Sequence, residues 1–190
     1  MRVILASKSP RRRELLKGLF SDFEIITRDT DETTPSDMHP RESVEVLAVR
    51  KGAAVLSRET ENALIIASDT LVELDGSPLG KPTDEADAVS MLMRLSGKRH
   101  NVHTGVSVHY GGRVFSGVDT SSVIFRSFSE SEALDYVKTG EPMDKAGAYA
   151  IQGIGAVLVE KYEGSFDTIV GLSMSLTERL VNLAVENDKG

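Results

Sequence analysis

Three consecutive arginines follow a helix-start signal near the beginning of the chain. Ser9 and Pro10 predict a helix start, because serine side chains cap free backbone N–H groups and proline favours the first helical position. The first helical turn carries a partial positive charge that repels Arg11, Arg12 and Arg13 by roughly 0.3–1 kcal/mol each. A bound phosphate would attract both the helix start and the arginines. The spacing therefore indicates an anion site at this helix start.

A second candidate for chemistry is Asp69, which lies where the apolar run of residues 63–67 ends. A carboxylate within such an apolar segment is costly unless it is paired or binds a metal. Ligands of open α/β sheets usually lie at the carboxyl ends of buried strands. Asp69 is therefore a candidate catalytic carboxylate. The alternative is a buried aspartate that caps local backbone N–H groups.

Two lysines add cations to this set. Lys51 interrupts an apolar stripe at helical spacing that consists of Val44, Leu47, Ala48 and Val55. Its ammonium group either extends from the edge of the stripe into solvent or lies over an anion site. Lys81 follows Gly80 in "GSPLGKP", where the glycine spacing and Pro82 exclude a P-loop. Lys81 either reaches a phosphate or is solvated.

Together these residues form an inventory of cations and acids. The cations are Arg11, Arg12, Lys51 and Lys81, with Lys145 as a further candidate, and the acids are Glu32 and Asp69. Such a set suits the binding of a polyphosphate with its divalent metal, with a carboxylate left to activate water. The four histidines have no metal-ligand spacing, and the absence of cysteine excludes thiol ligands and disulfides. The glycines of "KAGAYAIQGIG" indicate close backbone approach around Gln152 and do not form a dinucleotide-binding motif.

Bulk properties limit the class of protein. The 190 residues suit one domain or one domain built from two lobes, and 40% hydrophobic with 27% charged residues are typical of a soluble globular protein. A net charge of −7 argues against a dedicated nucleic-acid binder. The apolar run after Arg2 is too short for a signal peptide or a membrane span, so we expect a cytoplasmic location.

The elements that must position these residues alternate between strands and helices. Apolar runs and turn signals predict strands at residues 2–6, 23–27, 63–67, 102–108, 114–125 and 157–162. Helical spacing and caps predict helices at residues 10–19, 41–60, 84–95, 130–138 and 168–186. In the last of these helices one apolar stripe is expected, which consists of Ile169, Leu172, Leu176, Leu180 and Leu183. Gly111-Gly112 marks a hairpin, and Ser129 with Glu132 forms a capping box. We therefore expect an α/β fold with a mixed sheet.

Several motifs in this chain resemble those of the Maf family of nucleotide pyrophosphatases. They are "ASKSPRRRELL", "DE" at 31–32, "RKGAA" at 50–54, "ASDT" with "LGKP", "DKAGAYAIQG" and "EGSF…VGL", in order along nearly the whole chain. The resemblance implies a single Maf-like domain over residues 1–190, without a separable linker. It implies a mixed twisted sheet with flanking helices and two lobes around a central cleft, similar to the inosine-triphosphate pyrophosphatases.

The resemblance also implies cleavage of nucleoside triphosphates to the monophosphate and pyrophosphate, with a divalent cation such as Mg²⁺, Mn²⁺ or Co²⁺. Asp69 would be the catalytic base, and Glu32 and Asp69 would bind the metal. The further residues implied are Lys51 and Lys81 in catalysis, and Ser7, Arg11, Arg12, Thr70 and Gln152 in substrate binding. Arg11, Thr70 and Gln152 would select the base, as in the branch similar to dTTP/UTP pyrophosphatases.

Alternatives stay open beside this interpretation. A 7-methyl-GTP or purine-type pyrophosphatase would keep the chemistry and change the base, although the related branch typically carries tryptophan where this chain has Arg11. A regulator of cell division that only senses nucleotides would need the cations without Glu32 and Asp69. Asp167 and Ser173 stand where relatives often carry Asn and Pro, so the entry into the last helix is open. No nucleic acid or membrane is expected as a partner, and a homodimer and a role in septum formation are left open.

Overall fold

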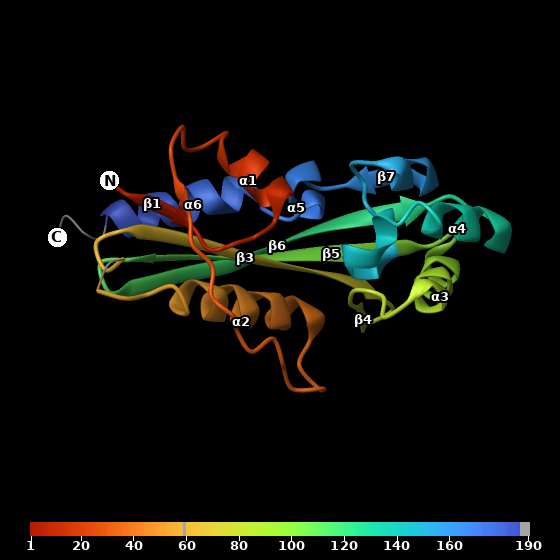
Figure 1. Ribbon diagram of the computed structural model, residues 1–190, viewed down its shortest axis with the longest axis horizontal. Helices are drawn as coiled ribbons and strands as arrows, with labels where there is room; N and C mark the ends of the chain where they lie inside the picture. The colour runs from red at the N-terminus through yellow and green to blue at the C-terminus, as the bar shows by residue number, and fades with distance from the viewer. Residues whose placement is uncertain (59, 187–190) are drawn as a thin grey trace. The chain divides into compact units, whose positions relative to one another are not determined.

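The computed structural model describes residues 1–58 and 60–186. Within these residues the strands form a seven-stranded mixed sheet of order β2-β1-β3-β5-β6-β7, and β4 pairs with β3 (Figure 1). β1 is parallel to β2 and β3, whereas β4 and β7 are antiparallel to their neighbours. The strands are β1 (Val3–Leu5), β2 (Glu24–Ile25), β3 (Leu64–Leu74), β4 (Ser77–Leu79), β5 (Arg99–Tyr110), β6 (Arg113–Phe125) and β7 (Val159–Glu163).

The α-helices are α1 (Pro10–Leu16), α2 (Pro40–Ala53), α3 (Glu85–Leu95), α4 (Glu130–Val137), α5 (Phe166–Val170) and α6 (Met174–Glu186). Short 3₁₀ helices are η1 (Glu141–Asp144), η2 (Ala146–Ala148) and η3 (Ile154–Leu158). Among the described helices, none combines the length and apolar character that crossing a bilayer requires. The mixed α/β fold class expected from the sequence is confirmed.

The chain clusters into two compact units. The first unit comprises Met1–Thr70, Thr104–Asp119 and Gly171–Gly190, and the second comprises Leu71–His103 and Thr120–Val170. The strands β3, β5 and β6 contribute residues to both units.

The core of the first unit follows the alternation of side chains along its strands. Val3 and Leu5 of β1 face the cluster that α1 and α6 cover, whereas Ile4 faces the opposite side. On that opposite side lies α2, as Figure 1 shows, and Gly105 of β5 touches the α2 backbone so closely that a Cβ there would meet the Val44 carbonyl oxygen at 2.2 Å. β1 and the first residues of β3 are therefore buried on both faces, as their continuous apolar sequence predicts, whereas the two residues of β2 are exposed.

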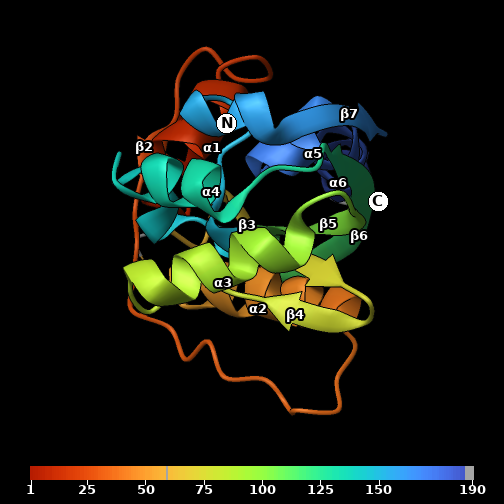
Figure 2. The ribbon, with the colours of Figure 1, turned by 90° about the vertical axis from the view of Figure 1, so that its right-hand side faces the viewer.

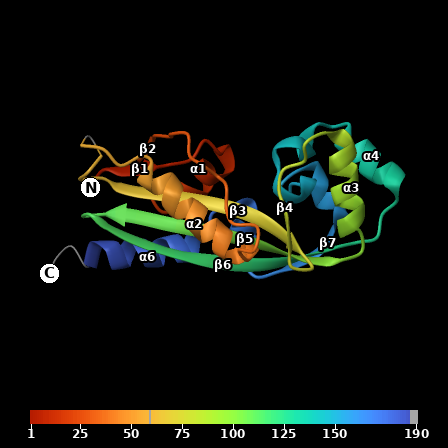
Figure 3. The same ribbon diagram turned by 90° about the horizontal axis from the view of Figure 1, so that it is seen from below.

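The core of the second unit gathers α3, α4 and the ends of β3, β5 and β6. α3 and α4 lie side by side, as Figures 2 and 3 show. Phe125 is fully buried and packs edge-on against Tyr149, with ring centroids 4.7 Å apart. Aromatic edge contacts of this kind add to the stabilisation that burial alone provides.

Helix starts agree with the sequence better than helix ends do. Ser9 accepts a hydrogen bond from the Arg12 backbone N–H at 3.4 Å with Pro10 at the first position, as predicted. The capping box of Ser129 and Glu132 is confirmed as well. α1 and α2, however, end at residues 16 and 53, several residues earlier than expected. The sequence also missed the His39 cap, whose Nδ1 accepts from the Arg41 N–H at 3.1 Å.

Three expectations about elements were wrong. β3 does not end at residue 67 but continues through Asp69 to Leu74, because its last residues pair with β4. β4 was not predicted, since its residues lie within a segment that the sequence indicates to be a turn. The expected helix 168–186 is divided into α5 and α6, because Gly171 has a φ of +127° that no helix contains. The apolar stripe of that helix also ends before Leu183, which is 42% exposed.

Candidate active site

Arg12 connects three segments of the first unit. Its Nε donates to the Gly171 carbonyl at 2.7 Å, its Nη2 to Thr70 Oγ1 at 3.1 Å and its Nη1 to Ser7 Oγ at 3.4 Å. A guanidinium group has five N–H donors, so these three bonds, counted over residues 1–58 and 60–186, leave two of them available. Arg12 therefore joins α1 to the segment after β1, to β3 and to the α5–α6 connection, and it retains donors for an anion.

Burial and the neighbouring charges change the pKa of Arg12 in opposite directions. Burial lowers the pKa of Arg12, and nearby Asp69 opposes this effect. Arg11 adds a smaller lowering contribution and Glu32 a smaller raising one. Within the triple arginine, Arg11 and Arg12 are partly buried, whereas Arg13 is exposed.

Lys51 binds two carboxylates at once. Its Nζ lies 2.5 Å from Asp69 Oδ1 and 2.9 Å from Glu32 Oε1. The side chains of Lys51 and Asp69 are only 18% and 13% exposed, whereas that of Glu32 is 63% exposed. α2 thus presents Lys51, and β3 presents Asp69. The ammonium group neither extends freely into solvent nor lacks a partner, so the charge on the apolar stripe has a structural explanation.

Asp69 is not a backbone cap. Within residues 1–58 and 60–186, its carboxylate makes a hydrogen bond to Lys51 alone, and that bond uses Oδ1. Asp69 Oδ2 is therefore available to accept a proton or to bind a cation. A largely buried carboxylate that has one ionic partner and one available oxygen suits a general base.

The donor set also fits a divalent cation. Glu32 and Asp69 lie close to each other, since both bind Lys51 Nζ, and Asp69 Oδ2 makes no hydrogen bond within residues 1–58 and 60–186, so a cation can bind at Oδ2 beside the ammonium group. The described part of the chain contains no group of three or more His, Cys, Asp or Glu side chains that could hold a metal. Mg²⁺ commonly uses one or two carboxylates together with substrate phosphates and water. The residues present therefore match a metal that binds together with a phosphate ligand.

Further hydrogen bonds hold in place the hydroxyl groups and the carbonyl group that bind Arg12. The Gly171 carbonyl oxygen also accepts from Ser68 Oγ at 2.9 Å, and Thr70 Oγ1 lies 2.9 Å from Thr104 Oγ1. Ser7 is only 7% exposed, and its Oγ accepts a hydrogen bond from the Ser9 backbone N–H at 3.2 Å. Ser68, Thr104 and Gly171 were not predicted as site residues. A glycine that interrupts an apolar helical pattern is a signal that could have identified Gly171.

The remaining predicted residues, Lys81 and Gln152, belong to the second unit and are exposed. The Lys81 loop is tied to η2, since the Gly147 N–H donates to the Gly80 carbonyl at 3.0 Å. Gly147 has a φ of +69°, and a Cβ there would meet Val72 at 3.0 Å. The second unit therefore brings two of the sequence motifs together, "LGKP" and "KAGAYAIQG".

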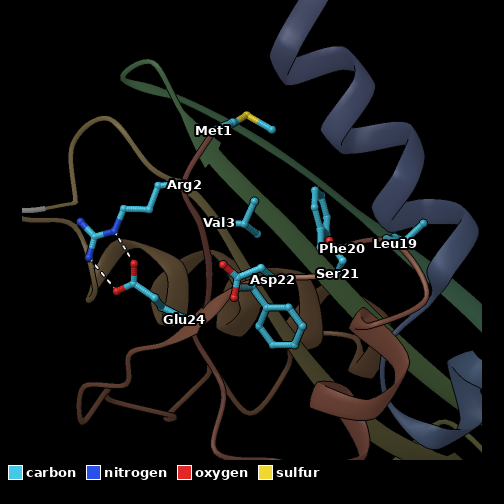
Figure 4. A pocket seen from close by; sticks show the side chains of 9 residues that line it. Met1, Arg2, Val3, Leu19, Phe20, Ser21, Asp22 and Glu24 are labelled. Carbon is cyan, nitrogen blue, oxygen red and sulfur yellow. Dashed lines mark hydrogen bonds and ion pairs between the residues drawn. The ribbon is translucent and has the colours of Figure 1, made fainter.

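A cavity of about 360 Å³ lies elsewhere in the first unit (Figure 4). It is lined by Met1–Val3 and residues 19–24, and Arg2 closes one side through an ion pair with Glu24 at 2.7 Å. The cavity adjoins the amino end of β1, whereas Ser7 follows its carboxyl end. Ligands of α/β sheets bind at the carboxyl ends of strands, so the arrangement of charged groups is a better guide to the active site than this cavity.

Comparison with known proteins identifies the family of this chain. The model of the family described as "Maf-like protein" matches residues 2–184. A dTTP/UTP pyrophosphatase of Bacillus velezensis is 47% identical over 178 residues, which cover 94% of each chain. A dTTP/UTP pyrophosphatase of Aquifex aeolicus is 46% identical over 172 residues, 90% of each chain. The solved Ham1 protein of Staphylococcus aureus shares the fold over the full length of both chains, with a TM-score of 0.53 at 17% identity. A family match over nearly all residues, together with close relatives of equal length, establishes that this chain belongs to the Maf family.

Proposed function

We propose that this chain is a nucleoside triphosphate pyrophosphatase that hydrolyses dTTP and UTP to the monophosphate and pyrophosphate. The observation that carries the proposal is the convergence of Lys51, Asp69 and Glu32 at one point of the first unit, with Arg12 close to Asp69. A site that binds only nucleotides would need the cations and would not need two carboxylates. The relatives of 42–47% identity are named as dTTP/UTP pyrophosphatases, which supports the same activity.

The residues of the first unit have complementary tasks in this reaction. Asp69 accepts the proton of the attacking water at its available oxygen, as a general base does. Arg12 has two unused N–H donors and Lys51 has its ammonium charge, so both can neutralise phosphate oxygens of the substrate. Ser7 and Thr70 orient the Arg12 guanidinium by hydrogen bonding. The fixed positive charges stabilise the pyrophosphate as it leaves.

Glu32 and Asp69 would hold the divalent cation, such as Mg²⁺, Mn²⁺ or Co²⁺. When bound, such an ion lowers the pKa of water and neutralises phosphate charge. Glu32 is the more exposed of the two carboxylates, so it can turn towards a phosphate-bound cation at little cost. Nucleoside triphosphates belong to the cytoplasmic nucleotide pool, and we assign the protein to that compartment.

We assign Lys81 to the substrate phosphates and Gln152, with Arg11 and Thr70, to the base. Uracil and thymine present an N–H donor between carbonyl acceptors, and a carboxamide can pair with one donor and one acceptor. The exposed Gln152 makes no hydrogen bond to any other residue in the described part of the chain, so its carboxamide is available. An amide can also turn over and present the reversed pattern to cytosine, so CTP and modified pyrimidine nucleotides are expected substrates as well. A contact of Arg11 or Thr70 with a base carbonyl would fix the orientation that favours UTP and dTTP, which makes CTP the weaker substrate.

A nucleotide panel with product analysis tests the proposal. We expect higher kcat/KM for UTP and dTTP than for CTP, GTP and 7-methyl-GTP, and chromatography should detect the monophosphate and pyrophosphate. Release of a diphosphate and orthophosphate would refute the bond assignment. A higher kcat/KM for 7-methyl-GTP than for both UTP and dTTP would refute the base assignment. Binding without turnover of any nucleotide would favour a sensor.

A further inference from the structure

The Glu141 carboxylate receives three hydrogen bonds within the second unit. Its Oε1 accepts from the Ile154 backbone N–H at 3.0 Å, and its Oε2 accepts from the Gly155 N–H at 2.8 Å and from Tyr136 Oη at 2.7 Å. Hydrogen bonds to a charged acceptor are about twice as strong as neutral ones. Glu141, the first residue of η1, therefore holds the first two residues of η3 in place.

The opposite end of the same loop is fixed by Tyr136. The Ala150 backbone N–H donates to Tyr136 Oη at 3.1 Å, and this hydroxyl in turn donates to Glu141. One connected pair of side chains thus binds the backbone at residue 150 and again at residues 154–155. Only residues 151–153 lie between these anchors, and Gln152 is the central one.

Two glycines permit this close approach. A Cβ on Gly153 would meet Glu141 Oε1 at 2.1 Å, and a Cβ on Gly155 would meet Tyr136 Oη at 2.4 Å. The backbone of Gly153 is extended, with a φ of −176°, so conformation alone does not demand glycine there. The glycine is needed because a carboxylate occupies the space of a side chain. Two residues of "IQGIG" are therefore explained by Glu141 and Tyr136.

The charge of Glu141 is maintained by these contacts. Burial by itself would raise the pKa of its carboxyl group, but hydrogen bonds from Tyr136, Gly155 and Ile154, with the nearby Lys145, lower it overall. Glu141 is therefore a carboxylate at neutral pH and accepts all three donors at once.

We propose that Glu141, acting with Tyr136, is a positioning residue for the base-reading carboxamide of Gln152, and so sets the preference for UTP and dTTP. This inference rests on the proposed function, in which Gln152 pairs with the base. Glu141 itself touches neither base nor phosphate in this role. It acts by holding three residues of backbone between fixed ends, which lowers the entropy lost when Gln152 binds a base.

Glu141→Gln is the sharpest test. A carboxamide has one acceptor oxygen and one NH₂ group, so in either orientation its NH₂ group faces the N–H of Ile154 or of Gly155. The substitution removes one anchor without changing side-chain size. Glu160→Gln is the matched control, because Glu160 is an exposed glutamate on β7 of the same unit. Tyr136→Phe is a second variant, which removes both the bond from the Ala150 N–H and the bond to Glu141, so exchange at the Ala150 amide should accelerate in it.

Two measurements on each variant decide the matter. Hydrogen exchange at the Ile154 and Gly155 amides, followed by NMR, should accelerate in Glu141→Gln and not in Glu160→Gln. The ratio of kcat/KM for UTP over CTP should fall by about threefold to tenfold in Glu141→Gln, as expected when one neutral hydrogen bond to the base is lost. Gln152→Ala should lower the same ratio, and the double variant should lower it no further.

Unchanged exchange would overturn the anchoring of the loop. Faster exchange with an unchanged UTP/CTP ratio, while Gln152→Ala lowers that ratio, would overturn the positioning role and leave the proposed function intact. Additive losses in the double variant would also overturn it, because Glu141 would then act independently of Gln152. A wild-type protein without pyrophosphatase activity, or a Gln152→Ala variant with the wild-type ratio, would instead refute the proposed reaction or base reader, and the inference with it.

Discussion

Burial of His100 makes the stability of this protein depend on pH. His100 is 2% exposed, its Nε2 lies 2.9 Å from Tyr149 Oη, and its ring packs edge-on against Phe125 at 4.8 Å. Burial lowers the pKa of His100 from 6.5 to about 4. Between these two values the unfolded chain binds a proton that the folded protein excludes. The contribution of His100 to the free energy of unfolding therefore rises with pH across this window and is lost as the pH falls towards 4.

The size of the effect follows from the two pKa values. The difference between the pKa of His100 in the unfolded chain and in the folded protein corresponds to about 3 kcal/mol of unfolding free energy, at about 1.4 kcal/mol for each pKa unit. Between pH 7 and pH 5 the same linkage lowers the free energy of unfolding by about 2 kcal/mol. In a domain of this size that loss lowers Tm by about 4–8 °C.

His100→Phe isolates this contribution. Phenylalanine keeps an aromatic ring in the cluster and cannot bind a proton. Tyr149 loses its partner, which lowers stability by a constant amount, because burial raises the pKa of the Tyr149 hydroxyl and it does not ionise near neutral pH. Burial also lowers the pKa of His109, but this residue is present in both proteins and its contribution cancels in the difference.

Urea unfolding at pH 7, 6 and 5, monitored by circular dichroism, provides the assay. We expect the loss of unfolding free energy between pH 7 and pH 5 to be about 2 kcal/mol smaller in His100→Phe than in the wild type. His39→Asn is the control, because His39 is exposed and asparagine can still cap α2. Equal pH dependence in the wild type and His100→Phe would refute the reasoning, as would an equal change in His39→Asn.

Three further substitutions test the site. Asp69→Asn should lower kcat by about 10²–10⁴-fold with an unchanged circular dichroism spectrum, and an unaltered kcat would reject Asp69 as the base. Lys51→Met keeps the apolar stem of the side chain and removes its charge. We expect kcat/KM to fall by about 10²-fold and the free energy of unfolding to fall by about 1–3 kcal/mol. A loss of stability with normal turnover would instead show that the role of Lys51 is structural. Gly171→Ala strains a φ of +127° and moves the carbonyl that receives Arg12, so Tm should fall and KM should rise. Gly76→Ala, at a φ of +79° with no atom near its Cβ in the second unit, controls for backbone strain, and equal KM changes in both would contradict the role of Gly171.

Interactions between residues close in sequence were sufficient to predict much of the fold. The Ser9 cap, the Ser129–Glu132 capping box and the hairpin at Gly111-Gly112 follow from bonds between residues close in sequence, so short motifs predict them. The early end of α2 and the full length of β3 are not decided locally. β3 continues past Asp69 because β4 pairs with it, and no periodicity within residues 63–74 contains that information.

The sequence by itself determined which chemical groups are present: arginines at a helix start, lysines beside glycines and apolar stripes, and carboxylates at the end of an apolar run. Tertiary structure decided how they pair. Lys51 meets Asp69 across 18 residues of chain, and Arg12 meets Thr70 across 58 residues and Gly171 across 159. Residue type determines what a side chain can donate or accept, whereas burial and the crossing of distant segments determine which partner it finds. That is why Gly171, a residue without a side chain, became visible as a support of Arg12 only in the folded chain.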